Sequence, residues 1–166
     1  ALKVQSPDIP HKSQAGGVVL NIDSHTDVGQ QFKSMQSTIS QNFPKAIIDG
    51  FLIQEMSEPG LEIILGINNR EGFGPILMVG FGGIHVEKTR DVAFAPVPLG
   101  EDDCNQLLKK LKGSVLLDAD KYDVPALINL MTALSDFAES TSDYIREIDL
   151  NPVLVHPKGQ GITVID

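Results

Sequence analysis

The sequence contains no tryptophan, only one cysteine and no long apolar run. Cys104 has no partner within the chain, so an internal disulfide is excluded and a reducing, cytoplasmic setting is expected. None of the apolar runs approaches the roughly 20 residues that cross a bilayer, so we expect no membrane span. Basic residues are also scarce, since 13 Lys and Arg stand against 22 Asp and Glu, for a formal net charge of −9. This balance argues against a non-specific nucleic-acid binder, which must neutralise backbone phosphates.

What is present is typical of a folded protein. Hydrophobic residues make up 42% and charged residues 21% of 166 positions, which suits one domain or two small subdomains. The first residues, Ala1 to Val4, have the pattern of the middle of a strand. We therefore expect the chain to be a piece of a longer protein.

The hydrophobic periodicity predicts an α+β fold. Two amphipathic helices are indicated, one around the apolar stripe of Cys104 to Leu111 and one that opens at the N-cap Asp123 and turns Met131 and Phe137 inward. An earlier helical stripe runs from Val28 to Ile39. Strand patterns cover residues 2–5, 18–22, 51–56, 61–67 and 75–81, with a turn at 57–60 and a closing hairpin over 144–166. Strands in groups with clustered helices favour α+β over an alternating array.

The closing hairpin is the sharpest chemical feature. Strand alternation places Glu147, Asp149 and Asn151 on one face and Ile148, Leu150 and Leu154 on the other. A turn centred between Lys158 and Gly159 sets Asn151 opposite Asp166, with Asp149 as their diagonal neighbour. Oxygen ligands without His or Cys suit Mg²⁺. The alternative is a solvated polar face, and Pro152 is a residue that can bend the strand and shift its register.

A glycine-containing loop near the start is the second feature. The segment from His11 to Val18 includes Gly16 and Gly17, whose backbone N–H groups can approach phosphate oxygens. Lys3 and Lys12 can supply positive charge to the same group. A tight turn between two strands explains the glycines equally well, and the spacing of a Walker A motif is absent.

Several blocks together resemble the ATP-grasp domain of the ADP-forming (NDP-forming) acyl-CoA synthetases, such as ADP-forming acetate–CoA ligase. The chain is also similar to the nucleotide-binding part of succinyl-CoA synthetase. The blocks occur in the family's order over essentially the whole chain, at residues 3–13, 15–18, 50–56, 70–75, 82–87, 91–94 and 147–152.

The resemblance implies a nucleotide site for ATP or ADP. In it, Lys3 contacts the phosphates, and a mobile loop that includes Lys12, Ser13, Gly16 and Gly17 covers them. The hinge between the subdomains, which reads adenine through backbone groups, corresponds to Gln54, Glu55 and Met56. An acidic nucleotide contact corresponds to Glu62, and the Mg²⁺ ligands correspond to Asn151 and Asp166.

The resemblance also implies a phosphohistidine relay. His11 matches a histidine that accepts a phosphoryl group from a histidine on the CoA-binding portion and delivers it to ADP, and Asp149 matches an acidic residue that steadies the phosphohistidine. Imidazole suits this role because it is nucleophilic near neutral pH. The other implied partners are CoA-binding and ligase domains in the same or another chain, and the full protein is expected to be an oligomer.

The resemblance divides the chain into two parts. Residues 1–50 are the remainder of a truncated N-terminal ATP-grasp subdomain, and 51–166 form the C-terminal subdomain; alone, the fragment should not complete a catalytic cycle. An alternative keeps this fold but makes the chain a regulatory or acyl-CoA-sensing module, as in bacterial lysine acetyltransferases. The retained His11, Asn151 and Asp166 favour the enzyme, because a sensor needs no phosphoryl relay.

Overall fold

The structure, a computed structural model, describes residues 1–83 and 91–165. The chain forms two compact units, Ala1–Ser57 and Glu58–Asp166. Each unit has its own hydrophobic core. We describe each unit by itself.

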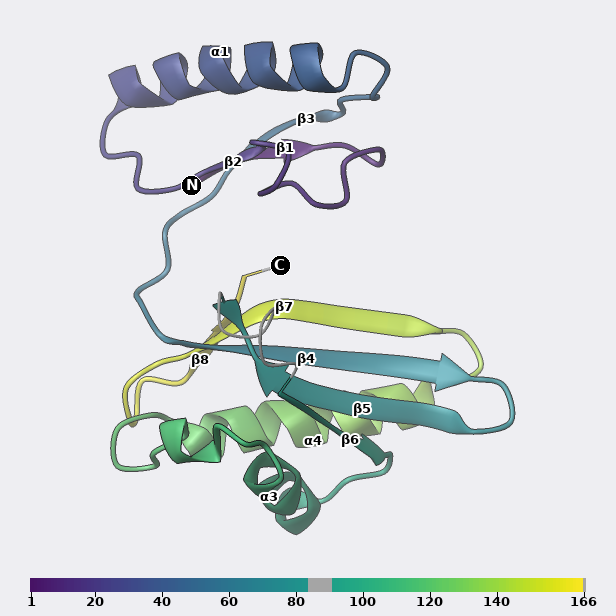
Figure 1. Cartoon of the computed structure of the whole chain (residues 1–166). Coiled ribbons are helices and arrows are strands. Elements are labelled where there is room, and N and C mark those ends of the chain that lie inside the picture. Colours follow the sequence, from purple (N-terminus) through teal and green to yellow (C-terminus); the bar gives the residue numbers. More distant parts are fainter. Residues whose placement is uncertain (84–90, 166) are drawn as a thin grey trace. The chain divides into compact units, whose positions relative to one another are not determined.

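The first unit is a small antiparallel sheet packed against one helix. Its three strands have the order β2-β1-β3, with bounds β1 Leu2–Gln5, β2 Val18–Val19 and β3 Gly50–Ile53. Helix α1, His25–Asn42, runs along one face of this sheet (Figure 1). Met35 and Ile39 of α1 are buried against Leu2 and Val4 of β1. Because strand side chains alternate, Lys3 lies on the face of β1 away from α1.

The second unit is a five-stranded antiparallel sheet of order β6-β5-β4-β7-β8. The strands are β4 Leu61–Arg70, β5 Gly74–Phe81, β6 Val92–Pro96, β7 Glu147–Val155 and β8 Ile162–Val164. Helices α3, Glu101–Lys109, and α4, Val124–Ser140, lie on the same face of the sheet (Figure 1), and a short 3₁₀ helix, Ser114–Leu116, lies between them in sequence. The opposite face carries no described helix of this unit and is open to a ligand.

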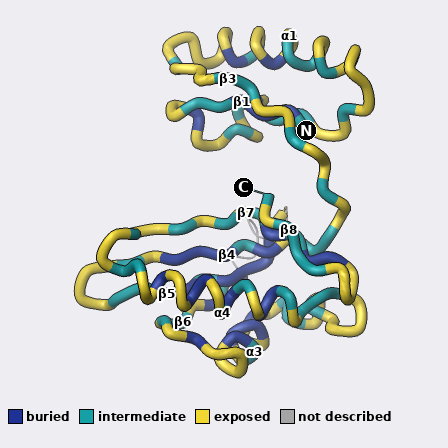
Figure 2. Tube along the Cα trace, turned by 180° about the vertical axis from the view of Figure 1, so that it is seen from behind, coloured by how far each residue is buried: buried dark blue, intermediate teal, exposed yellow. Residues whose placement is uncertain are grey.

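The periodicity correctly predicted the helices and most strands, with local corrections. Asp123 caps α4 as expected, its side chain accepting a hydrogen bond from the N–H of Ala126. Phe137, expected to face inward, is 47% exposed, and the next residue, Ala138, is buried instead. Buried and exposed residues alternate along both long helices, as an amphipathic stripe requires (Figure 2).

The boundary between the two parts lies later than the sequence interpretation placed it. Strand β3 pairs with β1, from Leu2 opposite Ile53 to Gln5 opposite Gly50, so residues 51–57 belong to the first unit rather than the second. Residues 57–60, predicted as a turn between two strands, connect strands of two different sheets. Backbone pairing between segments far apart in sequence determines where this boundary lies, and local periodicity does not encode such pairing.

The closing hairpin has the predicted register. Val153 faces Val164, Leu154 faces Thr163 and Val155 faces Ile162, which is the register that sets Asn151 opposite Asp166. The N–H of Ile165 donates to the carbonyl oxygen of Pro152 at 3.0 Å and extends this register by one step. Asp166 itself lies outside the described residues, so its pairing with Asn151 stays a prediction.

Strand β7 carries an irregularity against its other neighbour, β4. Ile63 faces Val153 whereas Leu65 faces Leu150, so a bulge lies at the strand position of Pro152. The bulge reverses the alternation: Ile148 and Leu150 pack on the core before it, and Val153 and Val155 do so after it. The prediction that Leu154 shares a face with Ile148 and Leu150 was therefore wrong.

Candidate functional site

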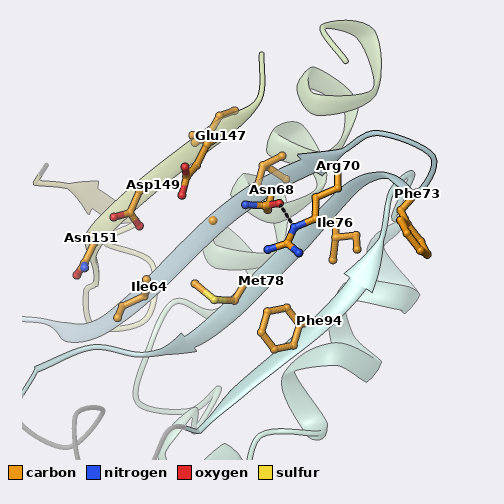
Figure 3. A pocket seen from close by; sticks show the side chains of 13 residues that line it. Ile64, Asn68, Arg70, Phe73, Ile76, Met78, Phe94, Glu147, Asp149 and Asn151 are labelled. Carbon is orange, nitrogen blue, oxygen red and sulfur yellow. Dashed lines mark hydrogen bonds between the residues drawn. The ribbon is translucent and has the colours of Figure 1, made fainter. Parts of the chain in front are cut away.

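A cavity of about 710 Å³ lies on the open face of the five-stranded sheet. Its walls come from the three neighbouring strands β4, β5 and β7 and from Phe94 of β6 (Figure 3). The lining residues are Ile64, Gly66, Ile67, Asn68, Arg70, Phe73, Ile76, Met78, Phe94, Glu147, Ile148, Asp149 and Asn151.

One side of this cavity is a row of oxygen-bearing side chains. Glu147, Asp149 and Asn151 are exposed on β7, and in Figure 3 they follow one another along the strand on the cavity side. The predicted face is therefore confirmed for these three residues. Their carboxylate and amide oxygens form a donor set that fits a hard cation such as Mg²⁺. Within residues 1–83 and 91–165, no group of three His, Cys, Asp or Glu is placed to hold a metal ion, so the metal ligands remain a prediction.

The other side of the cavity was missed by the sequence interpretation. It is built by Asn68 and Arg70 at the end of β4 and by the apolar side chains of Ile76, Met78 and Phe94. The alternation of Ile64, Gly66, Asn68 and Arg70 along β4 was the available signal, because period two places all four on one face. The long-range pairing of β4 with β7 determines which side chains lie beside these four residues.

The predicted phosphate loop of the first unit is a closed turn next to β1. The N–H of Gly17 donates to the carbonyl oxygen of Lys12, and the N–H of Val4 donates to that of Gly17, both at 2.8 Å. A Cβ on Gly17 would lie 2.4 Å from Cγ1 of Val4, so this position requires glycine for close approach. Gly16 has φ +75, the left-handed region that glycine tolerates. The tight-turn interpretation of these glycines is therefore supported, and a phosphate role remains compatible with it.

The lysine on the central strand is unusually buried. Lys3 is only 6% exposed on β1, between Val18 of β2 and Leu52 of β3. A lysine is rarely buried to this extent without a charged partner or ligand. By contrast, His11 and Ser13 are exposed and Lys12 is half-buried in the adjoining loop.

The predicted hinge residues lie at the end of β3, beside a second cavity. The N–H of Gln54 donates to the carbonyl oxygen of Ala1 at 3.0 Å and extends the β1–β3 ladder. Gln54, Glu55 and Met56 then line a cavity of about 320 Å³ together with Ala1, Leu2, Ile22, Asp23, Val28 and Ile53. Its mixture of apolar side chains and strand-end backbone is suited to a planar ring.

The predicted residues are thus not gathered at one described place. Lys3, the loop from His11 to Gly17 and Gln54 to Met56 belong to the first unit, whereas Glu62, Asp149 and Asn151 belong to the second. Glu62 is exposed on β4 opposite Leu154 and does not line the cavity that holds Asp149. Its carbonyl oxygen accepts from the N–H of Gly82 at 2.7 Å.

Comparison with known proteins identifies the fold and its class. Residues 1–166 match the ATP-grasp domain family, and the chain belongs to that family. Among solved structures, the chain superposes with a TM-score of 0.90, at 37% identity and over 99% of its length, on the Ca. Korarchaeum cryptofilum dinucleotide forming acetyl-coenzyme A synthetase 1 in complex with coenzyme A, Ca-AMPCP and HgCl+, of which it covers 72%. The α+β ATP-grasp fold expected from the sequence is confirmed.

The curated relatives are ligases. The sequence is 36% identical over 170 residues to the β subunit of ADP-forming acetate–CoA ligase II of Pyrococcus furiosus, covering 100% of this chain and 72% of that subunit. It is also 36% identical over 168 residues to the ADP-forming 4-hydroxybutyrate–CoA ligase of Nitrosopumilus maritimus, covering 99% of this chain. The chain spans only 24% of that second protein.

No helix in the described ranges combines the length and the apolar character needed to cross a bilayer.

Proposed function

We propose that this chain provides the nucleotide-binding part of an ADP-forming acyl-CoA synthetase. The reaction interconverts acyl-CoA, ADP and phosphate with free acid, CoA and ATP, and this chain transfers the phosphoryl group between a phosphohistidine and ADP. The observation that carries the proposal is the cavity on the open sheet face, where Asp149 and Asn151 of the family's last motif lie together. The CoA-binding and ligase domains belong to the same or a partner chain, and the assembled protein works in the cytoplasm as an oligomer.

The first unit supplies the phosphate contacts. Lys3 is held on the central strand by its buried stem, so its ammonium group is directed with little loss of side-chain entropy. Lys12, Ser13, Gly16 and Gly17 form the adjoining turn, in which the N–H groups of Gly16 and Gly17 hold the loop closed, and the lysine and the Ser13 hydroxyl complement phosphate oxygens. The adenine ring contacts Gln54, Glu55 and Met56, and Glu62 provides a further acidic contact to the nucleotide.

His11 carries the phosphoryl group in transit. In the transfer to ADP, the N–P bond to the imidazole breaks, its electron pair returns to the ring nitrogen, and a new P–O bond forms to the β-phosphate oxygen. By the family resemblance, Asp149 is the acidic residue that steadies the phosphohistidine. The exposed position of His11 on a surface loop supports this role, because the ring is free of the core.

Asn151 and Asp166 would hold Mg²⁺. When bound, this ion neutralises charge on the phosphates during transfer. Asn151 offers an exposed amide oxygen on the cavity side of β7, and Asp166 is its expected partner from the sequence pattern of the hairpin. The relatives compared above are ligases by name, which favours the enzyme over the regulatory alternative.

Transfer of label from ATP tests the relay. The chain incubated with Mg²⁺ and γ-labelled ATP should become labelled in an acid-labile, base-stable manner, as expected for phosphohistidine. His11→Ala should abolish the label, whereas His25→Ala, at the start of α1, should retain it because His25 belongs to none of the matched motif blocks. Equal labelling of the His11→Ala protein would remove His11 from the relay.

A titration tests the metal ligand separately. Asn151→Ala should weaken binding of the Mg²⁺ complex of AMPPCP by roughly tenfold, the cost of one interaction with a charged group. Asn105→Ala is the matched control, since Asn105 is on α3 and its amide donates only to the carbonyl of Glu101. Unchanged affinity in Asn151→Ala would exclude this residue as a ligand.

A further inference from the structure

Arg70 is the only basic residue among the described residues that line the large cavity. It shares the cavity with the carboxylates of Glu147 and Asp149, yet no ion pair joins it to a described acidic side chain. Arg70 is exposed at the end of β4, so its guanidinium group is accessible to a ligand in the cavity. The guanidinium group of Arg70 is instead oriented by a contact within its own strand.

The side chain of Asn68 sets that orientation. The Nε–H of Arg70 donates to Oδ1 of Asn68 at 3.1 Å. Figure 3 shows the guanidinium turned back along β4, beside Asn68 and on the cavity side of the sheet. The hydrogen bond uses Nε alone, so the paired N–H groups of Nη1 and Nη2 remain for an anion, in the planar geometry that matches phosphoryl oxygens.

The strand register fixes how far this group lies from the carboxylate of the proposed relay. Asn68 faces Glu147 across β4 and β7, and Gly66 faces Asp149. The guanidinium group therefore lies near Asn68. Along the strands, the position of Asn68 is two residues, or about 7 Å, from the position that faces Asp149. Gly66 has no side chain in the space between them.

We propose that Arg70 is a catalytic residue that contacts the phosphoryl group during its transfer, and that Asn68 is its positioning residue. The inference rests on the proposed function. As the N–P bond breaks and the P–O bond forms, negative charge is spread over the equatorial phosphoryl oxygens. Nη1 and Nη2 donate to these oxygens as the charge develops.

Binding measurements test the contact without relying on activity. The probes are the Mg²⁺ complex of AMPPCP, which has a terminal phosphoryl mimic, and AMP, which does not. Arg70→Ala should weaken AMPPCP binding about tenfold or more and leave AMP binding unchanged. The matched control is Arg146→Ala, because Arg146 is an exposed arginine of the same unit that does not line the cavity. Equal affinities of Arg70→Ala and the original protein for AMPPCP would overturn the inference.

Rates of labelling separate a catalytic from a structural role. Arg70→Ala should slow transfer from γ-labelled ATP to His11 by about 100-fold or more, the typical loss of one oriented charge stabiliser. Arg70→Lys keeps the charge but not the paired donors and should be intermediate, as should Asn68→Ala. Added guanidinium ion at millimolar concentration should partly restore the rate of Arg70→Ala only. Labelling that is equally fast in Arg70→Ala contradicts the proposal.

The two proposals fail in different ways. If the original protein binds no AMPPCP, the proposed nucleotide function fails, and the role of Arg70 fails with it. If the original protein binds AMPPCP and becomes labelled, and Arg70→Ala matches it in both assays, only the role of Arg70 is excluded. Thermal unfolding followed by circular dichroism confirms that each variant is folded, and Arg70→Lys provides the result if Arg70→Ala is not.

Discussion

At the scale of single residues, the buried carboxylate of Asp91 in the second unit has two backbone partners. The carboxylate of Asp91 is 7% exposed and accepts hydrogen bonds from the N–H groups of Lys112 at 2.8 Å and Gly113 at 2.7 Å. These N–H groups follow the end of α3. Asp91 thus ties the residue before β6, the strand that carries Phe94 into the cavity, to the chain beyond α3.

Replacing Asp91 should therefore be costly. In Asp91→Ala the two part-buried hydrogen bonds to the N–H groups of Lys112 and Gly113 are lost, and the free energy of unfolding should fall by about 2 kcal/mol. Urea unfolding measures this loss. Asp136→Ala, an exposed position on α4, should change stability by less than about 0.5 kcal/mol. An equally small loss of unfolding free energy in Asp91→Ala would show that Asp91 does not hold the start of β6 to the chain beyond α3.

Cys104 gives a pH-dependent prediction. Burial raises the pKa of its thiol above the usual 9.0, and the contact with Thr132 lowers it by less. The folded protein then holds its thiol proton to a higher pH than the unfolded chain does. Stability should be fully present below pH 9 and fall as the pH rises through the higher pKa of the folded state. Urea midpoints above pH 9 should fall more steeply for the original protein than for Cys104→Ala.

At the scale of elements, the hairpin of β7 and β8 is fastened to the start of α4. One oxygen of Asp123 caps α4 by accepting from the N–H of Ala126 at 3.2 Å. Its other oxygen accepts from the N–H of Gly161 in the hairpin turn at 2.8 Å. The same carboxylate therefore starts a helix and holds the turn of the hairpin that carries Asp149 and Asn151.

Loss of this double role should exceed the loss of a simple cap. Asp123→Ala should lower the free energy of unfolding by about 2 kcal/mol, since a cap and a part-buried hydrogen bond are removed together. Asp120→Ala removes only an exposed ion pair with Lys158, whose atoms lie 3.2 Å apart, and should cost less than about 1 kcal/mol. Chemical unfolding of both variants decides this; similar losses would argue against the double role.

Two glycines of the first unit should respond oppositely to the same substitution. Gly17→Ala introduces a Cβ at 2.4 Å from Cγ1 of Val4 and should destabilise the loop and β1. Gly29→Ala places a Cβ on exposed α1 with no atom within 4 Å and should stabilise the helix by about 0.5–1 kcal/mol. Thermal unfolding of the two variants should shift in opposite directions. Equal shifts would contradict the close packing at Gly17.

At the scale of the whole molecule, the chain has two separate hydrophobic cores. The first contains Met35, which is 2% exposed, and the second contains Met131, which is 0% exposed. Neither residue belongs to the core of the other unit. Stability is therefore expected to be local to each unit rather than shared over the chain.

Matched methionine substitutions test this separation. Met35→Ala should weaken amide protection in residues 1–57 by about 2–4 kcal/mol and leave the core strands of the second unit unchanged, and Met131→Ala should do the reverse. Hydrogen exchange followed by mass spectrometry resolves the two units. Loss of protection in both units from either substitution would show that they unfold as one.

Local sequence features account for much of the fold. The stripes of α1, α3 and α4, the cap at Asp123 and the register of the closing hairpin were all readable, because they depend on residues close in sequence. The match of ordered motifs predicted the ATP-grasp class, which is confirmed. The site roles of His11, Asn151 and Asp166 remain predictions for the experiments above.

Only the tertiary structure decided which strands meet. It joined β3 to β1, introduced the bulge of β7 against β4, and set Asn68 and Arg70 beside Glu147 and Asp149. The single cysteine excluded an internal disulfide, and the few basic residues argued against a non-specific nucleic-acid binder, from the sequence alone. These features did not show where Arg70 lies, because hydrogen bonding between strands far apart in sequence depends on the whole fold rather than on local periodicity.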